Sequence, residues 1–399
     1  MRILALAALA ATVLGSTVSP AAGPASGPVK STGTAVAPNP ALAGMPELTL
    51  KIVSQGYKGD GNVLDFSGMV YDHHRHKVLA FGGGHATARF PNSVHEFDLA
   101  TLRWTALTED VPPSAYTAEN AVKTKDGAKL GGVRWKGKIW AGSRHTYDGL
   151  VMHPTDCRML SLQAQEFIGA AYSMPEGGKF YRHHYQGGSG LWSFDPVKRE
   201  WSVSERPGLA SAYSIAELDG SQRDVVCFGS AQDSSFFALN LKTQEVRRLR
   251  PRPDYNRSAD MSLTWCPDTK SFFTFPCSDS GKGARIFEYL PAADAWKERT
   301  FKGDAPNTYS INVVYDPRAK VLACFAGGAF CYFSPADDTW YKAPGKVEMK
   351  RLFHHHVYDP VDNVHIAVGG GGGTGGWETY AYKFLDRSGS LPGTAKAGD

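Results

Sequence analysis

The chain has 399 residues, with 43 glycines, 24 prolines and a formal net charge of only +4 at pH 7. Its length and its glycine, proline and aromatic content suit one large all-β domain of short strands and tight turns. A charge so close to neutral gives no support for a nucleic-acid-binding surface or for a strong anionic-membrane patch.

The first 22 residues have the pattern of an export signal. One arginine precedes the apolar run Ile3–Gly15, and small residues follow at 19–23. The run is too short for a comfortable membrane span, and no later stretch is long and apolar enough. We therefore expect a cleaved signal peptide at 1–22, no membrane span, and a secreted or periplasmic protein.

The rest of the chain divides by composition. Residues 23–44 are rich in Ala, Pro, Gly, Ser and Thr, which predicts a disordered linker. Residues 45–385 form the predicted single folded domain, and residues 386–399 a flexible tail.

Inside this domain, Phe81–Trp104 is a repeat unit. It follows two short apolar strands joined by a turn, and it contains two more strands in which Asp98 precedes Trp104 by six positions. Four short strands at such intervals predict one antiparallel sheet. The same six-residue step joins Asp195 to Trp201, Asn240 to Val246, Leu290 to Trp296, and Ser334 to Trp340.

Repeated sheets of this kind predict a β-propeller, because each sheet buries its faces only against its neighbours. The last repeat, Phe353–Phe384, supplies three strands, and the unassigned strand Leu48–Val53 is predicted to complete it. Six repeats are legible. The interval around residues 108–160 is longer than the others. It contains either a degraded blade, which would make seven blades and is the favoured prediction, or a long loop attached to a six-bladed ring.

In a propeller, two sets of loops converge on one face around the channel. We expect this mouth to gather histidine, tyrosine and arginine side chains from several blades. The predicted residues are His85, Arg89, Asn92, Arg144, His145, Tyr147, Tyr181, Arg182, His184, Arg257 and His355. By contrast, His73, His74 and His76 belong to an exposed turn on the opposite face, and this turn is predicted to be no metal site.

These side chains suit β-elimination at a uronic acid, which needs a cation beside the carboxylate, a base for the C5 proton and an acid for the leaving oxygen. His85 and His145 are the predicted acid–base groups. Tyr147, expected two residues along an inner strand from His145, is the relay, and Arg182 neutralises the carboxylate. Glycoside hydrolysis is disfavoured because Asp148 and the few other acids of the mouth form no convincing pair.

The predicted substrate-binding residues complete this mouth. They are Arg89, Asn92, Arg144, Tyr181, His184, Arg257 and His355.

The blades, with GGGH ending at His85 and SRHTY at residues 143–147, resemble exported bacterial kelch-like propellers. They resemble more loosely the propeller polysaccharide lyases, including ulvan lyases and rhamnose–glucuronate lyases. The resemblance implies a lyase acting on a uronate-containing glycan, with a structural metal in some members. Galactose oxidase, similar by fold, implies instead a copper ion held by tyrosine and histidine.

The favoured hypothesis is therefore a monomeric lyase for an acidic polysaccharide that requires no cofactor, although calcium, zinc or copper could bind. A propeller that binds glycan or protein without chemistry is the alternative, and a copper-dependent oxidase the third.

Two further features stay open. The segment 108–142 is either a mere insertion or a sugar-stacking lid over the mouth, with Trp135 and Trp140 as candidate platforms. Among the six cysteines, Cys266 with Cys277, or Cys324 with Cys331, could form disulfides, or all could be buried thiols.

Overall fold

The computed structural model describes most of residues 36–392, and structural statements below refer to these described residues. The described ranges are 36–59, 67–83, 92–117, 119–127, 129–162, 190–205, 214–230, 234–253, 262–275, 285–306, 311–350, 355–370, 376–385 and 391–392.

Six four-stranded antiparallel sheets make up the body of the molecule, and we number them in chain order. Sheet 1 contains β2 (Ser67–Asp72), β3 (Lys77–Gly82), β4 (Val94–Asp98) and β5 (Arg103–Ala106). Sheet 2 contains β9 (Leu150–Met152), β10 (Met159–Ser161), β11 (Gly190–Asp195) and β12 (Glu200–Glu205). Sheet 3 contains β13 (Ser214–Leu218), β14 (Val225–Ser230), β15 (Phe236–Asn240) and β16 (Val246–Arg248).

The second half of the chain repeats this pattern. Sheet 4 contains β17 (Leu263–Cys266), β18 (Ser271–Thr274), β19 (Ile286–Leu290) and β20 (Ala295–Arg299). Sheet 5 contains β21 (Val314–Asp316), β22 (Val321–Ala326), β23 (Ala329–Ser334) and β24 (Thr339–Lys342). Sheet 6 contains β25 (His356–Asp359), β26 (Val364–Gly369), β27 (Trp377–Lys383) and β1 (Thr49–Tyr57).

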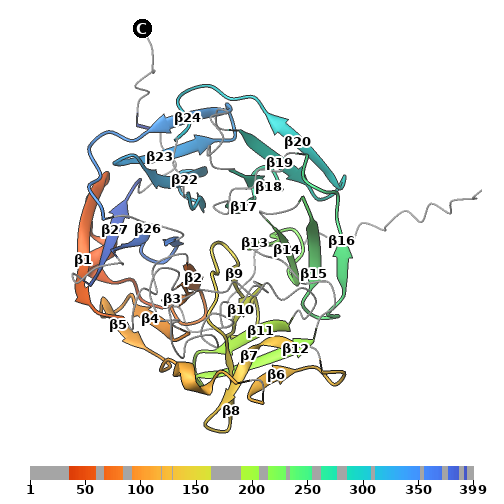
Figure 1. The fold of residues 1–399 in the computed structure, drawn as a ribbon. Coiled ribbons are helices and arrows are strands. Elements are labelled where there is room, and N and C mark those ends of the chain that lie inside the picture. Colours follow the sequence, from red (N-terminus) through yellow and green to blue (C-terminus); the bar gives the residue numbers. More distant parts are fainter. Residues whose placement is uncertain are drawn as a thin grey trace, which may run out of the picture.

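The sheets stand around a central space, in the manner of a propeller (Figure 1). The first strand of each sheet contacts the first strand of the next, in the order β2, β9, β13, β17, β21 and β25, and β25 contacts β2. The prediction of an all-β chain made of four-stranded antiparallel repeats is confirmed.

The six-residue step marks a turn between the third and fourth strands. Asp98 Oδ1 accepts hydrogen bonds from the backbone N–H groups of Ala100, at 2.8 Å, and Thr101, at 3.3 Å. Leu102 then adopts a left-handed φ of 57°, and Phe97 pairs with Trp104. An aspartate whose side chain accepts a hydrogen bond from the backbone two residues ahead is a strong turn former. The step at Asp98 therefore comes from a hydrogen-bonded turn that forms locally.

A separate three-stranded sheet occupies the long interval between sheets 1 and 2. It contains β6 (Ala121–Lys123), β7 (Lys129–Trp135) and β8 (Lys138–Ala141), preceded by the short 3₁₀ helix η1 (Pro113–Ala115). We call it the accessory sheet. Its strand β8 contacts β12, the outermost strand of sheet 2, and Figure 1 shows it at the outer rim.

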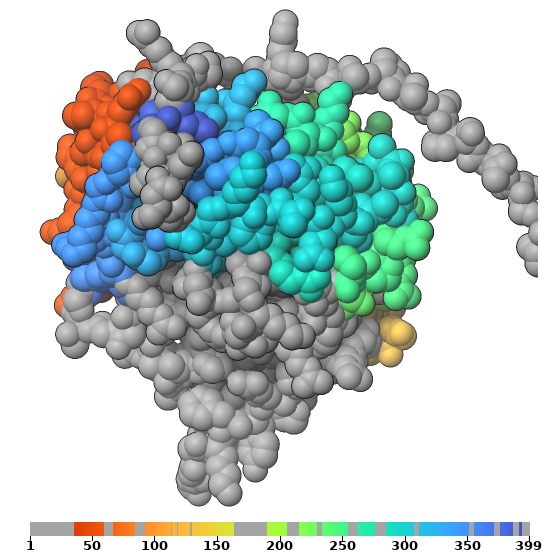
Figure 2. All heavy atoms as spheres, turned by 90° about the horizontal axis from the view of Figure 1, so that it is seen from above, coloured from red at the N-terminus to blue at the C-terminus, as the bar shows by residue number. Residues whose placement is uncertain are grey.

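Strand β1 joins the two ends of the domain. It pairs antiparallel with β27 from Thr49 opposite Lys383 to Tyr57 opposite Trp377, and Figure 2 shows the N-terminal strand in orange beside blue C-terminal strands. The short helix α1 (Pro40–Ala43) precedes it. The prediction that the N-terminal strand completes the last sheet is confirmed, and the strand extends further than Val53.

Sheets 1 and 6 meet at a packed seam. Its buried residues include Val78, Phe97, Ile366 and Trp377. Trp104 of sheet 1 lies edge-on to Trp377 at a centroid distance of 4.9 Å, and its indole N–H donates to Thr379 Oγ1 at 2.7 Å. The first and last repeats therefore share one core. No helix in the described part of the chain is long and apolar enough to cross a membrane.

Deleting residues 45–55 tests the role of β1. The deletion removes the part of β1 from Thr49 to Gln55 that pairs with β27 between Lys383 and Glu378, and so exposes the edge of β27. We expect loss of a cooperative thermal transition, since the missing contacts rival the total stability of about 5–15 kcal/mol of a typical domain. A chain that starts at Val36 is the control and should melt like the full protein. An unchanged melting temperature after deletion of 45–55 would contradict this role.

Candidate functional site

The predicted mouth residues divide into two groups. Six lie outside the described residues, namely His85, Arg89, Tyr181, Arg182, His184 and Arg257. The other five are described and buried, namely Asn92, Arg144, His145, Tyr147 and His355. Among the described residues, the candidate site is therefore built from the segment Arg144–Tyr147 and its surroundings.

This segment, which we call the site segment, connects β8 to β9 and docks on the backbone of sheet 1. Gly83 N donates to the carbonyl oxygen of Arg144 at 2.8 Å. The hydroxyl of Thr146 donates to Phe81 O at 2.6 Å and accepts from Gly68 N, also at 2.6 Å. One threonine thus satisfies backbone groups of both β2 and β3, which fixes the segment against the first repeat.

Two glycines make this approach possible. A Cβ atom on Gly68 would lie 2.3 Å from the carbonyl oxygen of Tyr147, and one on Gly82 would lie 2.6 Å from that of Arg144. Gly82 also has a φ of 99°, which L side chains rarely adopt. Packing against the site segment therefore explains why glycine stands at positions 68 and 82.

His145 and Tyr147 form a hydrogen-bonded pair. The distance from His145 Nδ1 to Tyr147 Oη is 2.9 Å, and the rings lie edge to face with centroids 5.3 Å apart. The predicted pairing is observed, but strand alternation does not produce it, because the site segment precedes β9. Tyr147 has a left-handed φ of 43°. Such strain in a bulky residue persists only where the surroundings enforce it, and it clusters at functional sites.

Asn92 and Arg144 hold the backbone around the site segment through hydrogen bonds of their side chains. The Asn92 side chain donates from Nδ2 to Ala141 O at 3.0 Å and accepts from Val111 N at 2.8 Å. Arg144 donates to the carbonyl oxygens of Gly142, at 3.0 Å, and Gly131, and its guanidinium lies 5.5 Å from the Trp192 ring centroid. In the described structure both side chains form hydrogen bonds with backbone groups. The predicted role of these two residues was contact with the substrate.

His355 reaches the same region from sheet 6. Its Nε2 atom lies 2.5 Å from Ser67 Oγ, one residue before Gly68. Ser67 and Gly68 therefore link β2 to His355 on one side and to the site segment on the other. His356 points elsewhere, with Nε2 2.9 Å from His365 Nδ1.

A pair of carboxyl groups that sequence reasoning missed lines the central cavity of about 460 Å³. Asp148 follows the strained Tyr147, accepts from Leu263 N at 2.8 Å, and has a pKa raised well above its usual value by burial and by the charge of Glu217. Burial raises the pKa of Glu217 to about 7. The signal was a glutamate in the apolar inner strand Ser214–Leu218. Its neighbour Asp148 lies outside the named strands, before β9, and forms an isolated bridge with Ile215.

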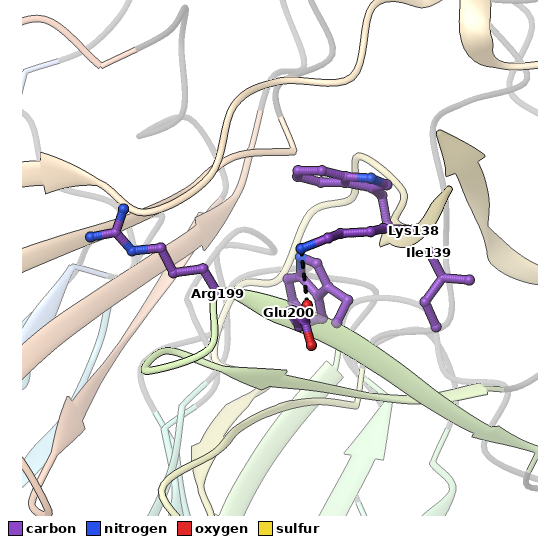
Figure 3. A pocket seen from close by; sticks show the side chains of 6 residues that line it. Lys138, Ile139, Arg199 and Glu200 are labelled. Carbon is purple, nitrogen blue, oxygen red and sulfur yellow. Dashed lines mark hydrogen bonds and ion pairs between the residues drawn. The ribbon is translucent and has the colours of Figure 1, made fainter. Parts of the chain in front are cut away.

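Of the two alternatives for the segment 108–142, an insertion or a lid over the mouth, the structure favours the insertion, because β8 packs on the outermost strand of sheet 2. Trp135 and Trp140 contact each other with centroids 5.5 Å apart. A groove of about 200 Å³ lies between β8 and sheet 2 (Figure 3). Lys138 there binds Glu200 at 2.9 Å, while Trp140 and Trp201 are only 8% and 6% exposed. The groove therefore offers no open aromatic platform for a sugar.

The turn with His73, His74 and His76 is only partly as predicted. His73 is exposed and His74 is half-buried, but His76 is 2% exposed and its Nε2 lies 2.9 Å from Asp359 Oδ2. Burial alone would lower the pKa of His76, but the hydrogen bond to Asp359 and the charges of Asp359 and Asp362 outweigh burial and raise it to about 9. The exposed-turn prediction is wrong for His76. This residue has a left-handed φ of 56°, and its side chain is buried against Asp359 and Asp362 of the neighbouring sheet.

Five cysteines lie in the described residues and none of them forms a disulfide: Cys157, Cys227, Cys266, Cys324 and Cys331. Cys324 and Cys331 are cross-strand partners on β22 and β23. The other proposed pair involves Cys277, which lies outside the described residues.

Comparison with known proteins leaves the chain without an assigned family. No protein-family model matches it, and no curated protein matches it significantly. Function must therefore be argued from the geometry of the site.

Replacing Gly82 tests the docking of the site segment. We expect Gly82→Ala to destabilise the fold by more than Gly127→Ala, with an excess of about 1–3 kcal/mol in chemical denaturation. Both glycines have similar left-handed φ values, 99° and 92°, but a Cβ on Gly127 meets nothing within 4 Å. The difference therefore isolates the clash with the site segment, and equal effects would contradict it.

The raised pKa of Glu217 predicts a pH dependence of stability. Between pH 4.5 and about 7 the unfolded carboxyl loses its proton while the folded one keeps it, so this group lowers stability as pH rises. Glu217→Gln should reduce the loss between pH 4 and pH 8 by about 3 kcal/mol, measured by denaturant unfolding. The exposed Glu245→Gln is the control. Parallel curves for the wild type and Glu217→Gln would contradict the prediction.

Proposed function

We propose that the six sheets are blades of a six-bladed propeller, which β1 closes. Two observations support this: the first strands contact one another in a cycle of six, and the accessory sheet contacts the outer strand β12. In this proposal the accessory sheet is an addition to the outside of the ring. The ring then has six blades, and not the seven that the sequence favoured.

We further propose that the protein is a secreted or periplasmic polysaccharide lyase that cleaves a uronate-containing glycan by β-elimination. The observation that carries the proposal is the hydrogen bond between His145 Nδ1 and Tyr147 Oη. A phenol bound to an imidazole is a ready path for a proton. The strain at Tyr147 and the two glycines beneath the segment support a site built to hold this pair.

The reaction requires a balanced movement of protons and electrons. A base removes the C5 proton, the C5–H electrons form the C4–C5 double bond, and the C4–O bond breaks. The leaving oxygen then takes a proton. The imidazole of His145 is the proposed base for the first transfer, and the Tyr147 hydroxyl relays a proton to the leaving oxygen.

The remaining roles fall to residues beyond the described part. His85 is the proposed second acid–base group and Arg182 the proposed cation for the carboxylate, since a planar two-pronged donor fits a carboxylate well. The chain leaves β3 toward His85 at Gly83, whose N–H binds the carbonyl of Arg144. This junction supports a role for His85 near the site segment. Arg144, bonded to two backbone carbonyls, serves as a positioning residue.

A binding propeller without chemistry is the second candidate. The observation that favours it is burial, because His145 and Tyr147 are each only 2% exposed. In this reading the pair is a structural hydrogen bond and glycan or protein binds elsewhere on the propeller.

Tyr147→Phe separates the two candidates. The wild type is incubated with ulvan, gum arabic, alginate, pectin and glycosaminoglycans while the ultraviolet absorbance of the unsaturated uronate is followed. If the protein is a lyase, Tyr147→Phe and His145→Ala should each lower kcat at least about 100-fold on the cleaved substrate. Tyr382→Phe, another buried tyrosine, is the control and should retain activity.

Thermal melting of the same variants shows whether the fold is intact. Wild-type rates in both Tyr147→Phe and His145→Ala would disprove the assigned site. If the wild type cleaves no uronate polymer but binds one, the binding propeller takes the place of the lyase.

A further inference from the structure

A buried histidine and two buried aspartates meet where sheet 1 adjoins sheet 6. His76 lies in the turn between β2 and β3, and Asp359 and Asp362 lie at the corresponding turn between β25 and β26. All three side chains are at most 2% exposed. One atom from each, Nε2 of the histidine and an oxygen of each carboxylate, lies within 4.8 Å of the other two. We call this group the seam cluster.

The distances between these atoms suit a small cation. His76 Nε2 lies 2.9 Å from Asp359 Oδ2 and 3.4 Å from Asp362 Oδ2. Zinc ligands lie about 2.0–2.2 Å from the metal, so neighbouring ligands at tetrahedral angles are separated by about 3.3 Å. The cluster is close to this spacing without any large movement.

The Oδ1 atoms of the two aspartates already accept hydrogen bonds from the backbone. Asp362 Oδ1 accepts from Asn39 N at 2.7 Å, and Asp359 Oδ1 accepts from Val361 N at 2.9 Å. These bonds orient each Oδ2 atom toward His76. Orientation of ligands by outer hydrogen bonds is usual at metal sites.

One ligand atom is left unsatisfied. Asp362 Oδ2 is buried and accepts no hydrogen bond from the described residues, because the His76 N–H nearest to it bonds to Asp359. A buried carboxylate oxygen without a donor is costly. The nearby Lys383 ammonium donates to the carbonyl oxygens of Ala43, at 3.1 Å, and Asp362, at 3.3 Å. A divalent cation would satisfy both carboxylates together.

A similar junction elsewhere lacks the third ligand. Between sheets 5 and 6, His365 Nε2 lies 3.1 Å from Asp316 Oδ2, and both are 1% exposed. The Nδ1 atom of His365 binds His356, at 2.9 Å. This pair is satisfied by hydrogen bonds alone. The second carboxylate is therefore what distinguishes the seam cluster within the described part of the chain.

We propose that His76, Asp359 and Asp362 bind one divalent cation of the zinc type at the junction of the first and last sheets. One imidazole and two carboxylates suit zinc better than calcium or magnesium, which prefer all-oxygen sites. The ion joins turns 283 residues apart in sequence and stabilises closure of the propeller. It takes no part in the proposed elimination.

Zinc titration of the metal-stripped full chain, by calorimetry and elemental analysis, tests this proposal. We expect about one zinc per chain and a melting temperature that rises with zinc and falls with a chelator, since a ligand that binds only the folded state stabilises it. Asp362→Asn and His76→Gln should each weaken binding at least tenfold. Calcium and magnesium should not compete. Cobalt in place of zinc should give the visible absorption of a low-symmetry site.

Two controls match the cluster closely. Asp316→Asn changes the histidine–aspartate pair without a third ligand, and His73→Ala with His74→Ala removes the imidazoles of the same turn; both should retain one zinc. If Asp362→Asn does not fold, the wild-type titration and the cobalt spectrum decide. The proposal is overturned if the stripped wild type takes up no zinc, or if folded Asp362→Asn and His76→Gln bind zinc as the wild type does.

Discussion

The pairing of β1 with β27 is the constraint on which the rest of the architecture depends. A sheet in this chain buries its faces only against neighbouring sheets, so the first and last repeats must meet or leave apolar surface in water. The shared core of Val78, Phe97, Ile366 and Trp377 shows how sheets 1 and 6 meet. Because β1 precedes sheet 1 in the chain but lies in sheet 6, the backbone itself connects the two sides of this seam.

The repeat architecture was predictable because its signals are local. In this turn the side-chain oxygen of an aspartate or asparagine accepts hydrogen bonds from the backbone N–H groups two and three residues ahead. The fourth residue ahead has a left-handed φ, and the two strands are then joined by the six-residue step. Asn240 repeats it by accepting from Lys242 N and Thr243 N, both at 2.9 Å, and Gln244 has a φ of 65°. The accessory sheet has no such step, and a count of repeats could not tell it from a degraded blade.

The candidate site was less predictable because its contacts join distant segments. Residues two apart, such as His145 and Tyr147, could be paired from the sequence, yet the reason given, strand alternation, was wrong. The partner of Asp148 lies on another strand, and the partners of His76 lie near the other end of the domain. Turn alignment predicted exposure for His76, but it carries no information on what the next sheet presents to that turn.

Strand β2 carries both features of this molecule that point to function. At its start, Ser67 binds His355 of sheet 6 and Gly68 binds the site segment. At its other end, Asp72 leads into the turn that carries His76 of the seam cluster. Six residues of extended chain link these two ends, and all six pair with β3, which leaves the strand little freedom to move. A cation that tightens the junction of sheets 1 and 6 would therefore also restrain the position of Gly68 and, through Thr146, the backbone that carries His145 and Tyr147.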